Sequence, residues 1–152
     1  MKQQICILGS TGSIGTQALD VIAQHPDRFE VYCLTANNRV EQLAEQARQF
    51  NPAAVVIAND AHYARLKELL ADRPDIKVYA GPEALNSIVE AGPIDMVLTA
   101  MVGFSGLNPT IHAIKAHKKI CLANKETVVV AGELICQLAA EYQVPILPVD
   151  SE

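Results

Sequence analysis

Short apolar runs alternate along the whole chain with longer stretches in which apolar residues recur at helical spacing. The short runs, bounded by turn residues, predict buried strands, and the longer stretches predict amphipathic helices. The expected strands span residues 4–8, 29–36, 54–58, 77–80, 96–99, 119–123 and 145–149. The expected helices span residues 14–24, 40–50, 61–70, 82–92, 107–116 and 127–142. This alternation indicates successive βαβ units, so we expect an α/β fold: a Rossmann-like doubly wound, mostly parallel sheet of about seven strands with helices on both faces.

The first predicted helix, residues 14–24, has a clear apolar face. Ile14, Ala18, Val21 and Ile22 fall on one of its faces, and Pro26 ends it. We therefore expect this face to be buried against the sheet.

The composition fits one domain, residues 1–152. Half of the 152 residues are hydrophobic, which is enough for one substantial core, and no low-complexity or Gly/Ser-rich stretch divides the chain. The formal net charge of −5 is spread without basic clusters, which argues against nucleic acid and anionic membranes as partners. No apolar run is long enough to span a bilayer and no signal-like segment opens the chain, so we expect a cytoplasmic protein.

The four cysteines, Cys6, Cys33, Cys121 and Cys136, are far apart, and no C-x-x-C pair that could hold zinc is present. Three of them fall in predicted strands. We expect all four to be reduced residues that contribute to packing.

Gly9, Gly12 and Gly15 form a G-x-x-G-x-x-G turn that follows the first strand and opens the first helix. Glycine permits the tight turn and lets backbone amides approach a pyrophosphate, and the dipole at the helix start favours an anion. Thr11 and Ser13 add hydroxyl donors. The context predicts a dinucleotide-binding turn, and the alternative is an ordinary strand-to-helix turn that binds nothing.

The end of the second strand reads Ala36-Asn37-Asn38-Arg39. At this place in dinucleotide folds an acid binds the ribose hydroxyls of NAD, whereas a basic residue accommodates the 2′-phosphate of NADP. No acid occurs here before Glu41, and Arg39 can form charge-assisted hydrogen bonds with a phosphate. The pattern favours NADPH, and the alternative is a solvated arginine at the head of a helix.

Two polar triplets follow the last two predicted strands, at the edge where open α/β sheets assemble their sites. Asn124-Lys125-Glu126 could contact cofactor and substrate, or could simply be a polar helix start. Asp150 and Glu152 would share a face of a continued strand and could ligate Mg²⁺ or Mn²⁺, although a surface D-x-E pair is the alternative. Because the chain ends at this incomplete site, we expect it to belong to a longer protein with a downstream domain.

Three motifs together resemble the 1-deoxy-D-xylulose 5-phosphate reductoisomerase family in order and spacing: ILGSTGSIG at 7–15, LANKE at 122–126 and PVDSE at 148–152. The resemblance covers the whole chain but only the family's N-terminal NADPH-binding region, so the catalytic and C-terminal domains would lie outside it. It implies cofactor contacts at Thr11, Gly12, Ser13, Ile14, Asn124 and Glu126, and places Ala100 on the nicotinamide side. It further implies substrate contacts at Lys125, Ser151 and Glu152 and metal ligands at Asp150 and Glu152.

The sequence departs from the family pattern at Asn37, Asn38 and Arg39, where many members have Gly-Lys-Asn. These three residues are still the expected contacts of the 2′-phosphate. The departure leaves open whether Arg39 takes the place of the usual lysine.

The family rearranges the carbon skeleton of 1-deoxy-D-xylulose 5-phosphate with a divalent metal and then reduces the product with NADPH to 2-C-methyl-D-erythritol 4-phosphate, for isoprenoid synthesis. The resemblance implies that the full-length protein is such an oxidoreductase and isomerase, acts on a sugar phosphate, and is a homodimer. The metal would act as a Lewis acid on the substrate carbonyl. This chain alone is expected to bind NADPH weakly and to catalyse nothing, because a third metal-binding carboxylate is missing.

Two other interpretations stay open at the level of sequence. The first is the cofactor domain of another NADP-dependent reductase, such as a semialdehyde or homoserine dehydrogenase, in which Asp150-Ser151-Glu152 would not be expected. The second is a sensing module that binds a dinucleotide without chemistry and needs the glycine turn but not the carboxylates.

Overall fold

The computed structural model describes residues 2–101, 106–122 and 125–148, and within 125–133 and at 148 the description is limited to secondary structure. The strands are β1 (Gln3–Leu8), β2 (Phe29–Ala36), β3 (Ala54–Ile57), β4 (Lys77–Ala80), β5 (Met96–Thr99), β6 (Lys119–Leu122) and β7 (Ile146–Pro148). The helices are α1 (Ser13–Gln24), α2 (Val40–Phe50), α3 (Tyr63–Leu69), α4 (Pro82–Ile88), α5 (Leu107–Lys115) and α6 (Lys125–Tyr142), and a 3₁₀ turn, η1 (Asp60–His62), precedes α3.

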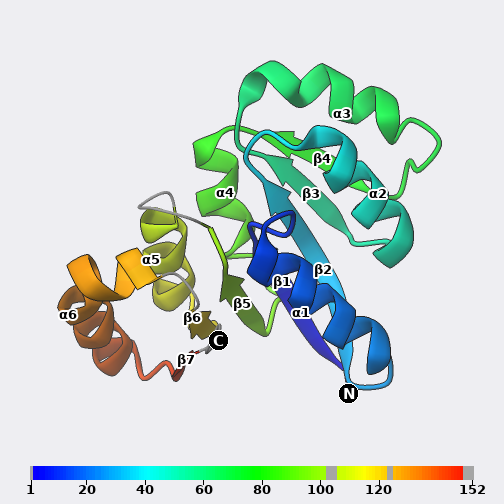
Figure 1. The fold of residues 1–152 in the computed structure, drawn as a ribbon. Helices are drawn as coiled ribbons and strands as arrows, with labels where there is room; N and C mark the ends of the chain where they lie inside the picture. Colours follow the sequence, from blue (N-terminus) through cyan, green and yellow to red (C-terminus); the bar gives the residue numbers. More distant parts are fainter. Residues whose placement is uncertain (1, 102–105, 123–124, 149–152) are drawn as a thin grey trace.

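The strands form one sheet in the order β4-β3-β2-β1-β5-β6-β7, and all pairings in the described part of the chain are parallel (Figure 1). The chain moves outward from β1 to β4, crosses back to β5 beside β1, and then moves outward in the opposite direction to β7. This reversal opens a crevice at the carboxyl ends of β1 and β5, where doubly wound sheets bind ligands. The predicted Rossmann-like α/β fold is confirmed.

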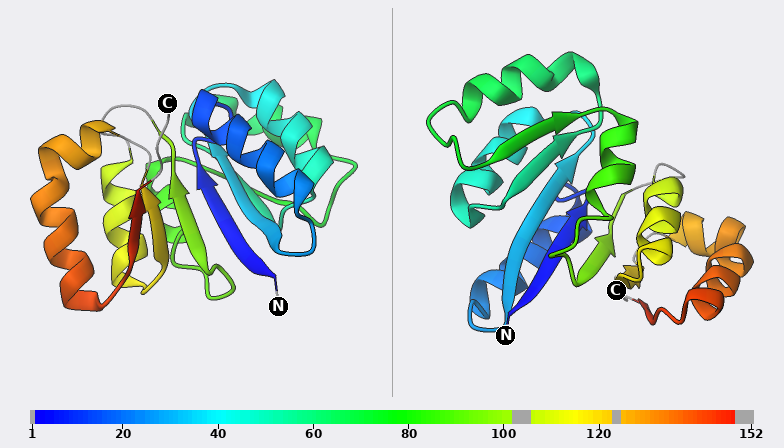
Figure 2. Two further views of the ribbon diagram at one scale, coloured as in Figure 1. Left: turned by 60° about the horizontal axis from the view of Figure 1, so that its bottom comes forward. Right: turned by 180° about the vertical axis from the view of Figure 1, so that it is seen from behind.

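Helices cover both faces of the sheet (Figure 2). The two buried clusters divide accordingly, because α1, α2 and α3 contribute to one cluster and α4, α5 and α6 to the other. Successive residues of β1 serve opposite clusters: Ile5 and Ile7 belong to the first, and Cys6 and Leu8 to the second. The central strand is thus covered on both sides over residues 5–8, which explains why these four residues are all apolar.

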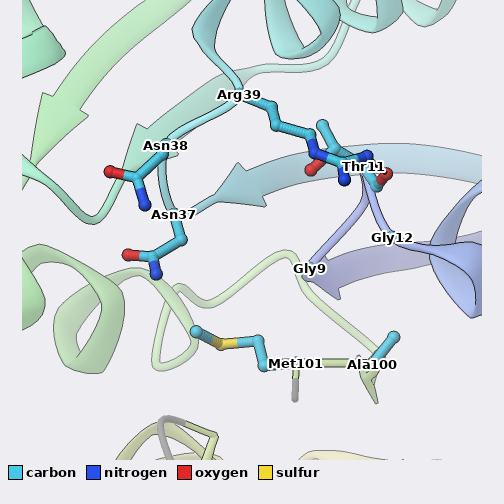
Figure 3. A pocket seen from close by; sticks show the side chains of 8 residues that line it. All are labelled: Gly9, Thr11, Gly12, Asn37, Asn38, Arg39, Ala100 and Met101. Carbon is cyan, nitrogen blue, oxygen red and sulfur yellow. Dashed lines mark hydrogen bonds between the residues drawn. The ribbon is translucent and has the colours of Figure 1, made fainter.

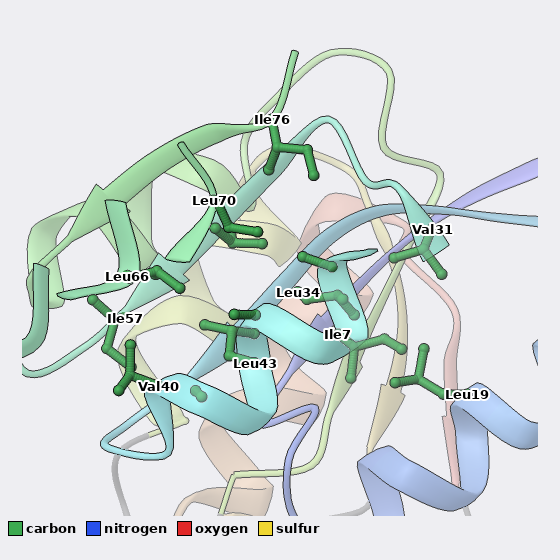
Figure 4. Close-up of a cluster of buried hydrophobic side chains, with 14 of the residues drawn as sticks. Ile7, Leu19, Val31, Leu34, Val40, Leu43, Ile57, Leu66, Leu70 and Ile76 are labelled. Atoms are coloured by element: carbon green, nitrogen blue, oxygen red, sulfur yellow. The ribbon is translucent and has the colours of Figure 1, made fainter. Parts of the chain in front are cut away.

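The first buried cluster lies between α1–α3 and the sheet (Figure 4). Its helix side includes Leu19, Ile22, Val40, Leu43 and Leu66, and its sheet side includes Ile5, Ile7, Val31, Leu34, Val55 and Ile57. Full burial of each Leu, Ile or Val side chain stabilises a fold by about 1.5–3 kcal/mol, so this cluster fixes α1 and α2 firmly beside the ends of β1 and β2.

The buried face of α1 differs from the prediction. Gly15, Leu19 and Ile22 are its buried residues, whereas Val21 is 50% exposed. The helix is turned because Gly15 packs directly on the preceding turn: a Cβ at this position would lie 2.3 Å from the carbonyl oxygen of Gly9. The predicted apolar face was therefore only partly right.

The rest of that predicted face lines an apolar groove of about 400 Å³ beside α1. Ile14, Ala18 and Val21 form the helix side of this groove, and its sheet side includes Met96 and Leu98 of β5. The groove borders the first buried cluster, since Ile22 and Leu98 belong to that cluster and Ala18 packs against it. Separately, no helix among the described residues has the length and apolar character needed to cross a membrane.

Most predicted elements agree with the structure to within two residues at each end, although α4 ends at Ile88 instead of near residue 92. The helix predicted at 61–70 begins differently, because η1 precedes α3. The Asn59 side chain accepts a hydrogen bond from the Ala61 amide at 3.0 Å, and the His62 amide donates to the Asn59 carbonyl at 3.1 Å. Such local bonds offer the backbone an alternative to a regular first helical turn.

All four cysteines are free thiols, but they do not share one environment. Cys6 and Cys33 are register partners in β1 and β2 and are fully buried, and burial raises the pKa of the Cys33 thiol. Cys121 is partly buried, whereas Cys136 is exposed on α6. The expectation of a packing residue is therefore wrong for Cys136.

Replacement of Gly15 by alanine is expected to destabilise the fold, because the new Cβ would lie 2.3 Å from the Gly9 oxygen and 2.6 Å from the Ser10 Cα. Since both are backbone atoms, the turn itself must move, and we expect a loss of about 3 kcal/mol in the free energy of unfolding. Urea denaturation followed by circular dichroism measures it. Gly92→Ala is the matched control, because a Cβ there meets nothing within 4 Å. Equal stability of the two variants would contradict the packing of α1 on the turn.

Candidate dinucleotide-binding site

A pocket of about 260 Å³ opens at the carboxyl ends of β1, β2 and β5 (Figure 3). Three segments form it: the glycine turn after β1, residues 37–39 after β2, and residues 100–101 after β5. Its lining residues are Gly9, Thr11, Gly12, Asn37, Asn38, Arg39, Ala100 and Met101. The pocket therefore lies at the topological switch point of the sheet, where such folds bind their ligands.

Gly9 brings the end of β1 against the end of β5. Its φ is +87°, and a Cβ on it would lie 2.9 Å from the Ala100 carbonyl oxygen. Glycine adopts this conformation without strain and leaves the space that the second segment occupies. The two sides of the pocket thus meet through backbone atoms.

The turn leads into α1, whose N-cap residue is Gly12. The first amides of an α-helix have no carbonyl partner within the helix, and Gly12 contributes no side chain to cap them. Because Gly12 also lines the pocket, these donors and the positive end of the helix dipole lie beside it. This end of the helix is suited to an anion such as a phosphate.

A buried hydrogen-bond network holds the turn in place. Ser10 donates from its amide to the Thr35 carbonyl at 2.8 Å and from its hydroxyl to the Gln46 side-chain oxygen at 2.7 Å. Gln46 returns a bond from Nε2 to the Ser10 carbonyl at 2.9 Å, and the Gly9 amide donates to the Thr35 hydroxyl at 3.0 Å. Ser10 and Thr35 are fully buried and Gln46 is 7% exposed, so these bonds form away from water. They anchor the turn to both β2 and α2.

Sequence reasoning missed Gln46 and Thr35. A signal for Gln46 was present, because it lies three residues after the buried Leu43 and so shares the apolar face of α2. A polar side chain on such a face needs a hydrogen-bond partner within the fold. What the pattern could not supply was the partner, which lies 36 residues away.

Arg39 is the one cationic side chain among the described lining residues of the pocket. Its Nη1 donates to the Thr11 carbonyl at 3.4 Å, which draws the side chain across the pocket towards the glycine turn. The nearest acid in sequence, Glu41, pairs instead with Arg65 at 3.3 Å, and within the described residues no carboxylate pairs with Arg39. The guanidinium therefore keeps most of its donors for an anion.

Asn37 and Asn38 lie beside Arg39 and are exposed in the pocket. Their positions are fixed from the end of β3. The Asn59 amide donates to the Asn37 carbonyl at 3.1 Å, and Asn59 Nδ2 donates to Asn38 Oδ1 at 2.7 Å. The segment that follows β2 is thus held on its outer side as well as by the strand.

The structure brings together six of the predicted cofactor residues: Thr11, Gly12, Asn37, Asn38, Arg39 and Ala100. Two others lie close by but do not line the pocket. Ser13 is exposed in the first turn of α1, where its hydroxyl accepts a bond from Gln17 at 3.4 Å, and Ile14 lines the apolar groove. Met101, buried next to Ala100, completes the pocket floor.

The remaining predicted residues cannot be compared with the pocket. Asn124, Asp150, Ser151 and Glu152 lie outside the described residues, and Lys125 and Glu126 begin α6 in the part where only secondary structure is described. Within the described residues no group of three His, Cys, Asp or Glu side chains could hold a metal ion. The elements that precede these residues are in place, because Leu122 and Pro148 are register partners at the ends of β6 and β7.

A family model described as 1-deoxy-D-xylulose 5-phosphate reductoisomerase matches residues 5–132 of this chain. The reductoisomerase of Bacteroides thetaiotaomicron is 71% identical over 151 residues, which make up 99% of this chain and 38% of that protein. The chain therefore spans about two fifths of the length of this relative.

Solved structures show the same relationship. The reductoisomerase of Zymomonas mobilis in complex with NADPH superposes with a TM-score of 0.93 at 39% identity, over 99% of this chain and 39% of that one. A DOX-P reductoisomerase in complex with NADPH, fosmidomycin and magnesium superposes with a TM-score of 0.92 at 39% identity, over 98% of this chain and 36% of that one. Sequence and structure agree, and the chain belongs to the 1-deoxy-D-xylulose 5-phosphate reductoisomerase family.

Proposed function

We propose that this chain is the NADPH-binding part of an enzyme that rearranges and reduces 1-deoxy-D-xylulose 5-phosphate to 2-C-methyl-D-erythritol 4-phosphate in isoprenoid synthesis. The observation that carries the proposal is the pocket at the switch point, which joins a glycine turn, a helix N-terminus and Arg39 without a carboxylate among its described lining residues. Its family supports the same assignment, since a member of similar structure was solved with NADPH.

The pyrophosphate of NADPH would lie on the turn at Thr11, Gly12, Ser13 and Ile14. Support comes from the geometry of backbone donors, which does not depend on where these side chains point. Ser13 and Ile14 can therefore contribute amides although their side chains do not line the pocket. The rigid anchoring of Ser10 keeps these donors in place before the ligand arrives.

The 2′-phosphate would lie at Asn37, Asn38 and Arg39. Arg39 supplies a permanent positive charge and a planar set of donors that suit phosphate oxygens. The alternative of a purely solvated arginine is less favoured, since the side chain reaches to the Thr11 carbonyl at the pocket wall. In this family member Arg39 would take the place of the usual lysine.

The nicotinamide would extend past Ala100 towards the ends of β6 and β7. Asn124 and Glu126 follow β6 and would contact the cofactor, while Lys125 and Ser151 would contact the substrate. The parallel register of β6 and β7 supports this arrangement, because the carboxyl ends of both strands lie at the same edge of the sheet as the pocket.

Asp150 and Glu152 would bind Mg²⁺ or Mn²⁺, and Glu152 would also lie against the substrate. Carboxylate oxygens are the donors that such hard cations prefer, so the residue types fit. When bound, the metal would polarise the substrate carbonyl and NADPH would supply the hydride. The role of this chain is to bind and orient, and on its own we propose that it binds NADPH weakly without turnover.

The full-length protein would act as a cytoplasmic homodimer on a small sugar phosphate. Membership of the family, which is described by the name of this sugar phosphate, supports the substrate. The net charge of −5 supports the absence of nucleic acid or an anionic membrane as partner.

Arg39→Ala is expected to weaken NADPH binding by about tenfold or more, because a charge-assisted hydrogen bond to phosphate is lost. NADH lacks the 2′-phosphate, so its affinity should change little. Isothermal titration calorimetry with both cofactors measures the effect, and Arg65→Ala, which removes a cation paired with Glu41 outside the pocket, is the control. Tighter binding of NADH than of NADPH by the unaltered protein would overturn the assignment of Arg39.

Gln46→Leu is expected to weaken the binding of NADPH and NADH equally and to lower the free energy of unfolding by about 1–3 kcal/mol, because Ser10 loses its two buried hydrogen bonds with Gln46. Titration with NADPH and NADH, together with urea denaturation, separates the two effects. Gln49→Leu changes an exposed residue of the same helix and should leave the cofactor affinities and the free energy of unfolding unchanged. A selective loss of NADPH alone would show that Gln46 acts elsewhere than through the turn.

Asp150→Asn in the full-length protein is expected to weaken Mn²⁺ binding by about tenfold or more, since one charged ligand is replaced by a neutral amide. Electron paramagnetic resonance of free Mn²⁺ measures the affinity. Asp75→Asn removes an exposed carboxylate on the loop before β4 and serves as the control for charge. Unchanged Mn²⁺ affinity in Asp150→Asn would remove the proposed metal site.

A further inference from the structure

Asn59, the second residue after β3, contacts the pocket segment without lining the pocket. Besides the bond that its carbonyl accepts from the His62 amide, three hydrogen bonds define its place. Its Oδ1 accepts from the Ala61 amide at 3.0 Å, its Nδ2 donates to Asn38 Oδ1 at 2.7 Å, and its own amide donates to the Asn37 carbonyl at 3.1 Å. Both ends of its side-chain amide are therefore engaged.

The Ala61 amide settles which way these side chains are oriented. A backbone N–H can only donate, so the Asn59 atom that faces it must be the oxygen. The Asn59 nitrogen then faces Asn38 and can only donate, so the Asn38 atom that meets it must also be the oxygen. One backbone group thus fixes two side-chain amides that could otherwise be turned either way.

The Asn38 amino group is consequently turned away from Asn59. In Figure 3 the Asn38 oxygen points outward from the pocket residues, and its nitrogen lies on the side of Asn37. Asn38 therefore offers its pocket side two N–H donors in place of a carbonyl oxygen. The neighbouring Arg39 side chain carries only hydrogen-bond donors. Both side chains therefore present donors to the pocket.

We propose that Asn59 is a positioning residue that sets the preference for NADPH over NADH, by holding the Asn38 amide with its donor towards the 2′-phosphate. The inference rests on the proposed binding of NADPH in this pocket. A phosphate monoester presents acceptor oxygens, so an inward amino group attracts it and an inward carbonyl oxygen repels it. NADH has no phosphate at this place, and its affinity does not depend on the orientation of Asn38.

Asn59→Asp tests the proposal with almost no change in shape. The carboxylate still accepts from the Ala61 amide, but it cannot donate to Asn38, whose amide must turn and present its oxygen to the pocket. We expect NADPH to bind about tenfold more weakly and NADH to bind as before, measured by isothermal titration calorimetry. Circular dichroism and the thermal midpoint confirm that the variant is folded.

The added negative charge of Asn59→Asp is separated from the effect on Asn38 by a double-mutant cycle with Asn38→Ala. If Asn59 acts through the Asn38 amide, Asn59→Asp has little further effect once Asn38 is alanine. An equal loss of NADPH affinity in both backgrounds would assign the effect to charge and overturn the proposal. Asn59→Ala removes the donor without adding charge, and we expect a loss of about threefold, because the Asn38 amide can then turn freely. If Asn59→Asp does not fold, the ratio of NADPH to NADH affinity in Asn59→Ala tests the proposal in its place.

The outcomes distinguish this inference from the function on which it rests. If the unaltered protein binds NADPH no better than NADH, the proposed function fails for this pocket. If it prefers NADPH and folded Asn59→Asp and Asn59→Ala keep the same ratio of NADPH to NADH affinity, the function stands and the role of Asn59 is wrong.

Discussion

The exchange of hydrogen bonds between Ser10 and Gln46 is the interaction on which the pocket depends. A turn rich in glycine has few side chains to pack and loses much conformational entropy when it is ordered. Here the order comes from outside the turn, because Gln46 and Thr35 satisfy the polar groups of Ser10 in a buried place. A buried polar group without a hydrogen-bond partner destabilises the fold by more than one such bond stabilises it. Conformations of the turn that would break these bonds are therefore strongly disfavoured.

Two glycines also hold the turn in place, because each allows a close approach between backbone segments. Gly15 packs α1 onto the turn, and Gly9 lets the turn meet Ala100 beyond β5. The buried clusters on both faces of β1 hold the strand from which the turn emerges. The pocket is thus formed by rigid elements, and among its described lining residues the exposed side chains of Asn37 and Arg39 can still adapt to a ligand. Such preorganisation is how a small set of donors can bind an anion specifically.

The arrangement of elements could be predicted from sequence because buried parallel strands are continuous apolar runs and helices repeat with their own period. The glycine turn and residues 37–39 could also be placed, since the carboxyl ends of neighbouring parallel strands share one edge. The roles of Gln46 and Asn59 could not be predicted, because their partners lie 36 and 21 residues away and depend on how elements pack. The exposure of Val21 was missed for a similar reason, since Gly15 turns α1 through a contact that periodicity does not contain.

The position of β5 beside β1 also determines at which stage of folding the pocket is complete. The hydrogen bond between Gln4 and Asp95 joins residues 91 apart. The pairing of β1 with β5 therefore requires the closure of a long loop. Pairings of such long range are slow steps in folding. The glycine turn and residues 37–39 can assemble early, but the wall at Ala100 forms only when β5 docks. A ligand that needs all three segments binds only the completed sheet, and by mass action it stabilises that state against the partly folded ones.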